Sequence, residues 1–406
     1  MDTNDLAIEL PSSKSLSNRW LVANHLAGGT MHLTRLSDSD DTRLLRQLLA
    51  QANRGGDNLY FCQNAGTVAR FLMAVLAITP GSHLLSGDDR LRQRPMSPLI
   101  ETLRSLGAKI ECTTREGYLP VRIVGTPLDR RTATIDPSAS SQFVSALLLI
   151  APKMPAGLSL TMTARPASRP YIAMTCEILR QCGVGVRFSS NGRTIYVDHC
   201  DTFAPPKTIT IERDWTAASY FFAAAALRPD LRIRLKSLAL NSLQGDATTN
   251  EIFARLGVSC REVRQPYRRD VRSLTLTGGG ERAKQITLSL IDNPDLMPTV
   301  AVACAALKVK ATLRGLHNLG AKESDRLSAV SAELQRLGVR TIVSDGTLTI
   351  FPSTLRPKGA VQTYGDHRMA MAFAPLKLLF PSLEIENPEV VTKSFPTFWQ
   401  QFNTLL

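Results

Sequence analysis

The stretch LRSLGAKIE, residues 103–111, leads from the end of an amphipathic helix into a strand through Gly107. Glycine directly after a helix is typical of a left-handed C-cap, because it has no Cβ to clash there. The same pattern recurs three times with glycine at positions 183, 257 and 338, in LRQCGVGVRF (179–188), FARLGVSCR (253–261) and LQRLGVRTIV (334–343). Successive glycines lie 76, 74 and 81 residues apart, which predicts a structural unit that recurs along the chain.

Stretches that are apolar on nearly every side alternate with these closings, as expected for helices enclosed by protein. They are SNRWLVANHLA, TVARFLMAVLAI, QFVSALLLIAP, TAASYFFAAAAL, PTVAVACAALKV and RMAMAFAPLKLLF. A side chain of the type favoured at helix N-caps opens each stretch, namely Ser13, Asn64, Ser140, Asp214, Asp295 and Asp366. Each unit therefore reads as strand, buried helix, strand, amphipathic helix and strand, which predicts an α/β fold with helices covering sheets.

Six such units in two sets of three predict two similar domains. The interval from Ser13 to Asn64 is the shortest between successive openings. The stretch after Asp366 matches it in length once the residues ahead of Ser13 are added. We therefore expect the N-terminal strand to complete the last unit and to make one domain discontinuous. This domain is placed at residues 1–12 plus 214–406 and the second at 13–213, with hinges near 12–14 and 211–214.

Composition narrows the classes of function. The chain carries a net charge of +13, but its aromatic content is only 6%, without the interleaving of aromatic and basic residues that a nucleic-acid platform needs. The seven cysteines and six histidines show no metal-ligand spacing. The first residues do not form a secretory signal, so we expect a cytoplasmic protein with reduced thiols, no metal and no membrane partner.

Basic residues gather near the expected helix starts, where unpaired N–H groups already favour anions. They are Lys14, Arg19, Arg70, Lys322, Arg326 and Arg368. This placement favours small anionic ligands. The stretch GAKESDRLSAV (320–330) is the densest case, and from its residues alone it reads either as a solvated helix start or as a cluster built for chemistry.

Ten motifs in order make the chain similar to the enolpyruvyl transferases, and within them to the EPSP synthase family, over essentially its whole length. They are LPSSKSLSNR, NAGTVARF, GDDRLRQRP, SSQFVSALL, SRPYIAMT, ERDWTAASYFF, NPDLMPTVAV, AKESDRLSAV, YGDHRMAMAF and VVTKSFPTFW. The resemblance implies two domains of three βαβαββ units each, with buried helices, an architecture like an inverse α/β barrel, and a ligand cleft between the domains. It also implies a monomer without a cofactor.

The reaction implied by the resemblance joins shikimate 3-phosphate to phosphoenolpyruvate and releases phosphate. Residues carried over for shikimate 3-phosphate are Lys14, Ser15, Arg19, Ser140, Ser141, Gln142, Ser168, Tyr171, Asp295, Asn318 and Lys322. Those for phosphoenolpyruvate are Lys14, Gly66, Arg94, Gln142, Arg326, Arg368 and Lys393. Asp295 is expected to accept the hydroxyl proton and Glu323 to protonate the methylene carbon, with Lys14 sharing the proton transfers. Asp325 is expected to cap or pair locally.

Three alternatives stay open at this point. A related enzyme transfers enolpyruvate to UDP-N-acetylglucosamine, but it commonly has a reactive cysteine where this chain has SGDDRLRQRP. A basic nucleic-acid-binding protein of the same architecture would account for the net charge. An inactive relative is disfavoured because Lys14, Asp295 and Glu323 are all present.

Overall fold

The computed structural model describes residues 5–54, 58–265 and 268–406. The chain divides into two compact units. The outer unit consists of Met1–Ser13 and Glu212–Leu406, and the insert unit consists of Lys14–Ile211.

The insert unit alternates helices and strands. Its helices are α1 (Lys14–Leu26), α2 (Asp40–Ala52), α3 (Gly66–Ile78), α4 (Asp89–Arg92), α5 (Ser97–Ser105), α6 (Ser141–Ile150), the 3-10 turn η1 (Ala151–Lys153) and α7 (Arg169–Gln181). Its strands are β2 (His32–Thr34), β3 (Asn58–Phe61), β4 (Gly81–Ser86), β5 (Lys109–Cys112), β6 (Val121–Gly125), β7 (Thr132–Ile135), β8 (Leu158–Met162), β9 (Val186–Phe188), β10 (Thr194–Val197) and β11 (Thr208–Thr210).

The outer unit has a similar composition of elements. Its helices are α8 (Trp215–Leu227), α9 (Thr249–Ala254), α10 (Met297–Ala306), α11 (Arg326–Arg336), α12 (His367–Phe373) and α13 (Phe398–Phe402). Its 3-10 helices are η2 (Gly245–Thr248), η3 (Pro294–Leu296), η4 (His317–Ala321), η5 (Ala374–Leu378), η6 (Pro388–Lys393) and η7 (Asn403–Leu405). Its strands are β1 (Leu6–Ile8), β12 (Arg232–Lys236), β13 (Ser259–Gln265), β14 (Arg268–Thr277), β15 (Gln285–Ser289), β16 (Lys310–Arg314), β17 (Thr341–Ser344) and β18 (Thr347–Ile350).

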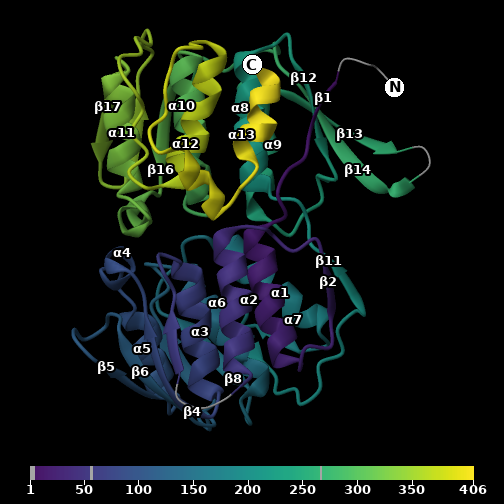
Figure 1. Cartoon of the computed structure of the whole chain (residues 1–406), viewed down its shortest axis with the longest axis vertical. Helices are drawn as coiled ribbons and strands as arrows, with labels where there is room; N and C mark the ends of the chain where they lie inside the picture. Colours follow the sequence, from purple (N-terminus) through teal and green to yellow (C-terminus); the bar gives the residue numbers. More distant parts are fainter. Residues whose placement is uncertain (1–4, 55–57, 266–267) are drawn as a thin grey trace. The chain divides into compact units, whose positions relative to one another are not determined.

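Four sheets share one topology, which confirms the predicted α/β fold. In each sheet a parallel pair is followed by an antiparallel hairpin, giving the orders β3-β4-β6-β5, β7-β8-β10-β9, β1-β12-β14-β13 and β15-β16-β18-β17. The pair β1 and β12 is separated in sequence by the insert unit. With the intervening helices, each of these four repeats reads βαβαββ. In Figure 1 the helices α8, α10 and α12 of the outer unit run between its two sheets.

The third repeat of each unit is shorter than expected. In the insert unit it has the parallel pair β11 and β2, because the chain passes from α2 to β3 with too few residues for another hairpin. In the outer unit a single bridge between Val361 and Ile385 accompanies α12. The expectation that the N-terminal strand completes this last repeat is wrong. Strand β1 instead pairs in parallel with β12, beside α8, where Ile8 is fully buried, and Val361 takes the corresponding place beside Ile385.

The buried helices explain the all-round apolar stretches. All thirteen residues of α8 are buried, and α10 and α3 are nearly as enclosed. Rings from α8, α13 and the segment between η6 and α13 pack edge to face at the centre of the outer unit, including Tyr220 against Phe398 and Phe395 against Phe398. Burial of this apolar surface is the main stabilising contribution to a core of this kind.

Helix caps follow the sequence prediction at three of the six expected positions. The side chains of Ser140, Asp214 and Asp366 accept backbone hydrogen bonds at the starts of α6, α8 and α12. Two expected caps are wrong. Ala65, not Asn64, is the N-cap of α3, and η3 precedes α10, so that Asp295 lies before the cap and its carboxylate is used elsewhere.

The four glycines that define the repeat all have positive φ, as their C-cap role requires. In each case the backbone N–H of the following residue donates to the carbonyl five residues back, as Ala108 does to Leu103 at 2.9 Å and Val258 to Phe253 at 3.0 Å. This bond satisfies one carbonyl that a helix end would otherwise leave unpaired. The chain then turns directly into a strand.

Among the residues that the structure describes, none of the helices is long and apolar enough to cross a membrane. Within the same ranges there is no group of three His, Cys, Asp or Glu side chains that could hold a metal ion.

We expect Gly257→Ala to lower the free energy of unfolding of the outer unit by about 2–3 kcal/mol. Its φ is +86°, and a Cβ there would lie 2.6 Å from the carbonyl oxygen of Gly280 and 2.8 Å from Cγ of Arg282. Gly359→Ala is the matched control, because its φ is +68° but the nearest atom is 3.8 Å away, so only backbone strain of about 1 kcal/mol remains. Urea unfolding followed by tryptophan fluorescence compares the two, and equal losses would contradict the packing argument.

Candidate active site

Arg326, the first residue of α11, lies at the centre of a cluster of buried charges in the outer unit. Its side chain is 1% exposed, and each of its three nitrogens donates to a carboxylate. Nε donates to Asp366 at 2.9 Å, Nη1 to Asp295 at 2.9 Å and Nη2 to Glu323 at 2.9 Å. The fork of the guanidinium therefore joins the starts of α11 and α12 to the turn η3.

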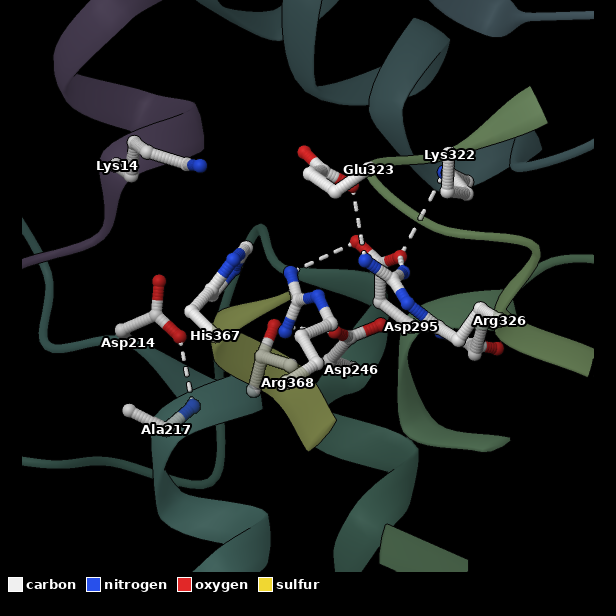
Figure 2. Close-up of polar contacts among 12 residues, drawn as sticks. Lys14, Asp214, Ala217, Asp246, Asp295, Lys322, Glu323, Arg326, His367 and Arg368 are labelled. Atoms are coloured by element: carbon white, nitrogen blue, oxygen red, sulfur yellow. Dashed lines mark hydrogen bonds and ion pairs between the residues drawn. The ribbon is translucent and has the colours of Figure 1, made fainter. Parts of the chain in front are cut away.

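Asp295 receives two further cations, as Figure 2 shows. Nη2 of Arg368 donates to it at 2.8 Å, and Nζ of Lys322 lies 3.5 Å from it. Burial alone would raise the pKa of Asp295, but Arg368, Lys322 and Arg326 together hold that pKa well below its usual range. The carboxylate is therefore ionised at neutral pH.

The same cluster orients Glu323. Its carboxylate accepts from Arg326, and Nζ of Lys393, the last residue of η6, lies 4.0 Å from it. Burial lowers the pKa of Lys322, whereas Asp295 raises it. The stretch 320–330 thus contributes to a charge cluster, and it also starts a helix, because Asp325 caps α11 by accepting from the backbone of Ser328.

Asp366 and Arg368 show how the GDHR motif is built into the site. Asp366 is fully buried, caps α12 through the N–H of Arg368 and also accepts from Arg326 and from Ser324. Nη1 of Arg368 approaches the hydroxyl of Tyr220 at 3.5 Å. Burial raises the pKa of Tyr220 to about 12, so its hydroxyl stays protonated.

In the insert unit, the start of α3 carries a second cationic group. Gly66 is the first residue of α3, and a Cβ there would lie 2.8 Å from Nη1 of Arg94 and 2.9 Å from Nη1 of Arg70. Arg70 also donates to Oε1 of Gln142 at 2.7 Å. Nε and Nη1 of Arg94 are buried and have no hydrogen-bond partner among the described residues. Unsatisfied buried donors of a cation are costly, which favours an anionic ligand at this point.

Arg19 is held by hydroxyls and rings in the same unit. Its nitrogens donate to Thr175 at 2.8 Å, to the carbonyl of Ser15 at 2.9 Å and to Ser145 at 3.1 Å. Its guanidinium carbon lies 5.4 Å from the ring centre of Phe71 and 5.6 Å from that of Tyr171. Burial lowers the pKa of Arg19 to about 10, so it stays charged at neutral pH.

Lys14 and the predicted serines lie at helix starts. Nζ of Lys14 donates to Asp41 at 2.9 Å, with both side chains largely buried. Ser140 caps α6 and Ser141 is its buried first residue. Ser168 precedes α7 with a φ of +58°, and its side chain is buried without capping that helix.

The structure thus gathers the predicted residues in groups. Asp295, Lys322, Glu323, Arg326, Arg368 and Lys393 share one network in the outer unit. Asn318 is in η4, and its buried Oδ1 has no hydrogen-bond partner among the described residues. Arg326 was expected to bind phosphoenolpyruvate, and this stays a prediction; in the structure its three nitrogens donate to Asp366, Asp295 and Glu323.

The partners of several polar side chains could not be predicted from the sequence. Asp41 lies in LSDSDDTR (36–43), a stretch whose acidic residues are typical of a helix start, and Ser39 caps α2 there. The same stretch gives no sign that Asp41 would bind Lys14. Arg70 was noted as a cation near a helix start, but nothing in the sequence pairs it with Gln142. Asp246, described below, follows no recognisable motif.

Two solved structures share the fold of this chain. EPSP synthase from Acinetobacter baumannii superposes with a TM-score of 0.76 at 23% identity, covering 98% of this chain and 96% of that chain. The enolpyruvyl transferase NikO from Streptomyces tendae gives a TM-score of 0.73 at 16% identity over 99% of this chain and 95% of that chain. At these identities the likeness shows the fold, which this chain shares with an EPSP synthase and with an enolpyruvyl transferase.

Sequence comparison identifies the family. Residues 5–402 match the family model EPSP synthase (3-phosphoshikimate 1-carboxyvinyltransferase). A 3-phosphoshikimate 1-carboxyvinyltransferase from Bacteroides fragilis is 39% identical over 97% of this chain and 93% of its own length, and one from a Sulfurovum species is 33% identical over 98% and 96%. The chain belongs to the EPSP synthase family.

Replacing Arg326 tests the importance of the charge cluster. We expect Arg326→Met to cost about 3–5 kcal/mol in the free energy of unfolding, because it leaves three buried carboxylates without their shared cation. Arg43→Met is the control, since Arg43 pairs with Asp40 at the same i,i+3 spacing but on the surface, where a pair contributes about 0–1 kcal/mol.

The pH dependence of the Arg326→Met effect has a defined sign. A carboxylate whose folded pKa is lowered stabilises the fold above its unfolded pKa, near 4, and this contribution is lost as the pH falls further. Asp295 is such a group. The loss caused by Arg326→Met should therefore shrink as urea unfolding is repeated below about pH 4. A loss independent of pH would show that packing, and not charge, is what Arg326 contributes.

Proposed function

We propose that this chain transfers the enolpyruvyl group of phosphoenolpyruvate to the 5-hydroxyl of shikimate 3-phosphate and releases phosphate. This is the reaction of the shikimate pathway that leads toward chorismate and the aromatic amino acids. The observation that carries the proposal is the match of residues 5–402 to the EPSP synthase family model. The charge clusters in both units support it, because both substrates carry a phosphate and a carboxylate.

Asp295 is the proposed base for the hydroxyl proton. Its two oxygens are fixed by Arg326, Arg368 and Lys322, so its direction is set before substrate arrives. Its low pKa makes it a weak base in the free protein. An anionic substrate that draws Arg368 or Lys322 toward itself would reduce this neutralisation and raise the basicity of Asp295. Substrate binding and base activation are thereby linked.

Glu323 is the proposed acid that protonates the methylene carbon, with Lys14 sharing the proton transfers. Addition of the hydroxyl oxygen to C2 and of a proton to C3 gives a tetrahedral intermediate. Loss of a proton from C3 and of phosphate from C2 then gives the enol ether product. Arg326 and Lys393 hold Glu323 from two sides, which restricts its carboxylate to one orientation.

Binding of the anions is assigned to cations and hydroxyls. Phosphoenolpyruvate is assigned to Gly66, Arg94, Gln142, Arg368, Lys393 and Lys14, with Arg326 acting behind them. Shikimate 3-phosphate is assigned to Lys14, Ser15, Arg19, Ser140, Ser141, Gln142, Ser168, Tyr171, Asp295, Asn318 and Lys322. Arginine forks match phosphate and carboxylate, and serine hydroxyls donate without adding charge. The buried unsatisfied donors of Arg94 support this assignment most directly.

The proposal further describes a monomer that works in the cytoplasm without a nucleic-acid partner. The seven cysteines are all unpaired in the structure, which favours a reducing compartment. Burial raises the pKa of Cys62, Cys176, Cys182, Cys260 and Cys304, so these thiols are not activated nucleophiles.

Phosphate release from phosphoenolpyruvate tests the function. It should require shikimate 3-phosphate and should not occur when UDP-N-acetylglucosamine is the only acceptor. Release with the nucleotide sugar would assign the chain to the sister activity. No release with either acceptor, together with steeply salt-dependent binding to arbitrary nucleic acid, would favour the binding-protein alternative.

Neutralising the proposed acid and base should affect turnover more than binding. We expect Asp295→Asn and Glu323→Gln each to lower kcat by about 100-fold to 10,000-fold. KM should not rise, because either change leaves the surrounding cations with a larger net positive charge for the anionic substrates. Asp345→Asn, which changes a carboxylate that is 96% exposed, is the control and should match the wild type. Wild-type turnover in either site variant would remove that residue from the mechanism.

Adding a methyl group at Gly66 should change KM for one substrate more than KM for the other. We expect Gly66→Ala to raise KM for phosphoenolpyruvate about tenfold, since the new Cβ displaces the ends of Arg94 and Arg70, and a tenfold change corresponds to about 1.4 kcal/mol. KM for shikimate 3-phosphate should change less than threefold, as measured by steady-state kinetics with each substrate varied in turn. Equal increases in both KM values would place Gly66 outside a phosphoenolpyruvate subsite.

A further inference from the structure

Asp246, in η2 of the outer unit, is a buried carboxyl group that the mechanism above does not use. Its side chain belongs to a residue only 2% exposed. Its Oδ2 accepts from the hydroxyl of Thr216, and its Oδ1 accepts from Nδ2 of Asn293 at 3.0 Å. Both bonds connect it to other elements, because Thr216 is in the first turn of α8 and Asn293 immediately precedes η3.

The bond to Asn293 links Asp246 to the proposed base. Asn293 is the residue from which the turn η3 starts, and Asp295 is the second residue of that turn. The side-chain amide of Asn293 therefore fixes the entry of η3 to Asp246, which is itself fixed to α8 by Thr216. Figure 2 shows Asp246 beside Arg368 and below the carboxylate of Asp295 in this view.

Charge connects the two acids as well. The charged groups that act on Asp246 are Asp295 on η3 and Arg368 on α12, whereas Glu251 of the adjacent helix α9 is exposed. Burial, followed by the negative charge of Asp295, raises the pKa of Asp246 to about 6, and Thr216 and Asn293 oppose this. When the pKa values of two neighbouring carboxyl groups are pushed apart in this way, the groups titrate as a coupled pair. One group then keeps its proton at a pH at which the other has already lost it.

We propose that Asp246 is a positioning residue for Asp295: through Asn293 it fixes the turn that presents Asp295, and its own charge sets the basicity of that carboxylate. The inference rests on the proposed function. When Asp246 loses its proton, a second negative charge lies near Asp295, and protonation of Asp295 becomes easier. Removal of the substrate hydroxyl proton should therefore become faster as the pH rises through the titration of Asp246.

The test is the pH profile of kcat from pH 5 to 8, measured by phosphate release with both substrates saturating. Wild-type kcat should rise between about pH 5.5 and 6.5, and Asp246→Asn should lose this rise while kcat at pH 7.5 falls about threefold to tenfold. KM values should stay within about twofold, because Asp246 does not contact substrate in the proposal. Asp345→Asn should keep the wild-type profile.

Two further variants separate charge from position. Asn293→Ala removes the link to η3, so kcat should fall about threefold to tenfold while the rise near pH 6 stays. Thr216→Val removes one donor that stabilises ionised Asp246, so the rise should move upward by about half a unit to one unit, and Thr216→Ser should restore it. These variants keep the inference testable if Asp246→Asn fails to fold, as judged by circular dichroism.

The outcomes distinguish this inference from the proposed function. An active wild type whose pH profile is unchanged in Asp246→Asn and in Thr216→Val would overturn the role of Asp246 and leave the enolpyruvyl transfer standing. The role of Asp246 would be supported if the rise of kcat near pH 6 moved only in Thr216→Val and disappeared in Asp246→Asn. A wild type that releases no phosphate with shikimate 3-phosphate would overturn both.

Discussion

The structure of the outer unit depends on one buried guanidinium. Arg326 is the cation shared by Asp366, Asp295 and Glu323, and these carboxylates come from three separate segments. Burial of so many charges is favourable only when each has a partner with good geometry. The planar fork of arginine meets this condition because its donors are spread over three nitrogens, whereas a lysine has a single charged nitrogen. The proposed acid and the proposed base are thus oriented by the same side chain, so neither can move without affecting the other.

The insert unit holds Arg19 and Arg94 without carboxylates among the described residues, whereas Lys14 pairs with Asp41. Arg19 is held by hydroxyls, a carbonyl and two aromatic rings, and Arg94 has buried donors without a protein partner in the described part of the chain. Cations left without acidic partners are suited to substrate anions. In the proposed function the two units contribute different kinds of group. The outer unit contributes acids that are held by cations and serve proton transfer, and the insert unit contributes Arg19 and Arg94, which have no acidic partner among the described residues.

Much of the fold could be predicted because it is encoded locally. A glycine at a helix end and a Ser or Asp at a helix start act within one turn, so Gly107 and Asp214 could be assigned from their neighbours alone. The partner of strand β1 could not be predicted in this way. Parallel strands pair across a crossover, and which of two repeats β1 joins depends on packing between segments that are far apart in the sequence. The family resemblance supplied the site residues, and the arrangement in space supplied the pairings. Asp41 and Asp246 show the limit, since their partners lie far away in sequence and only folding brings them together.

The crossing between the units has a consequence for synthesis. The two connecting segments run antiparallel, with Ser12 bridged to Arg213 and the N–H of Ser13 donating to the carbonyl of Glu212 at 2.8 Å. Nη1 of Arg213 also donates to the carbonyl of Leu10, 203 residues earlier. A nascent chain leaving the ribosome therefore exposes β1 long before its partner strand exists. Lys14–Ile211, a compact unit of its own, is synthesised in that interval, so β1 can pair with β12 only after the whole insert unit has been made.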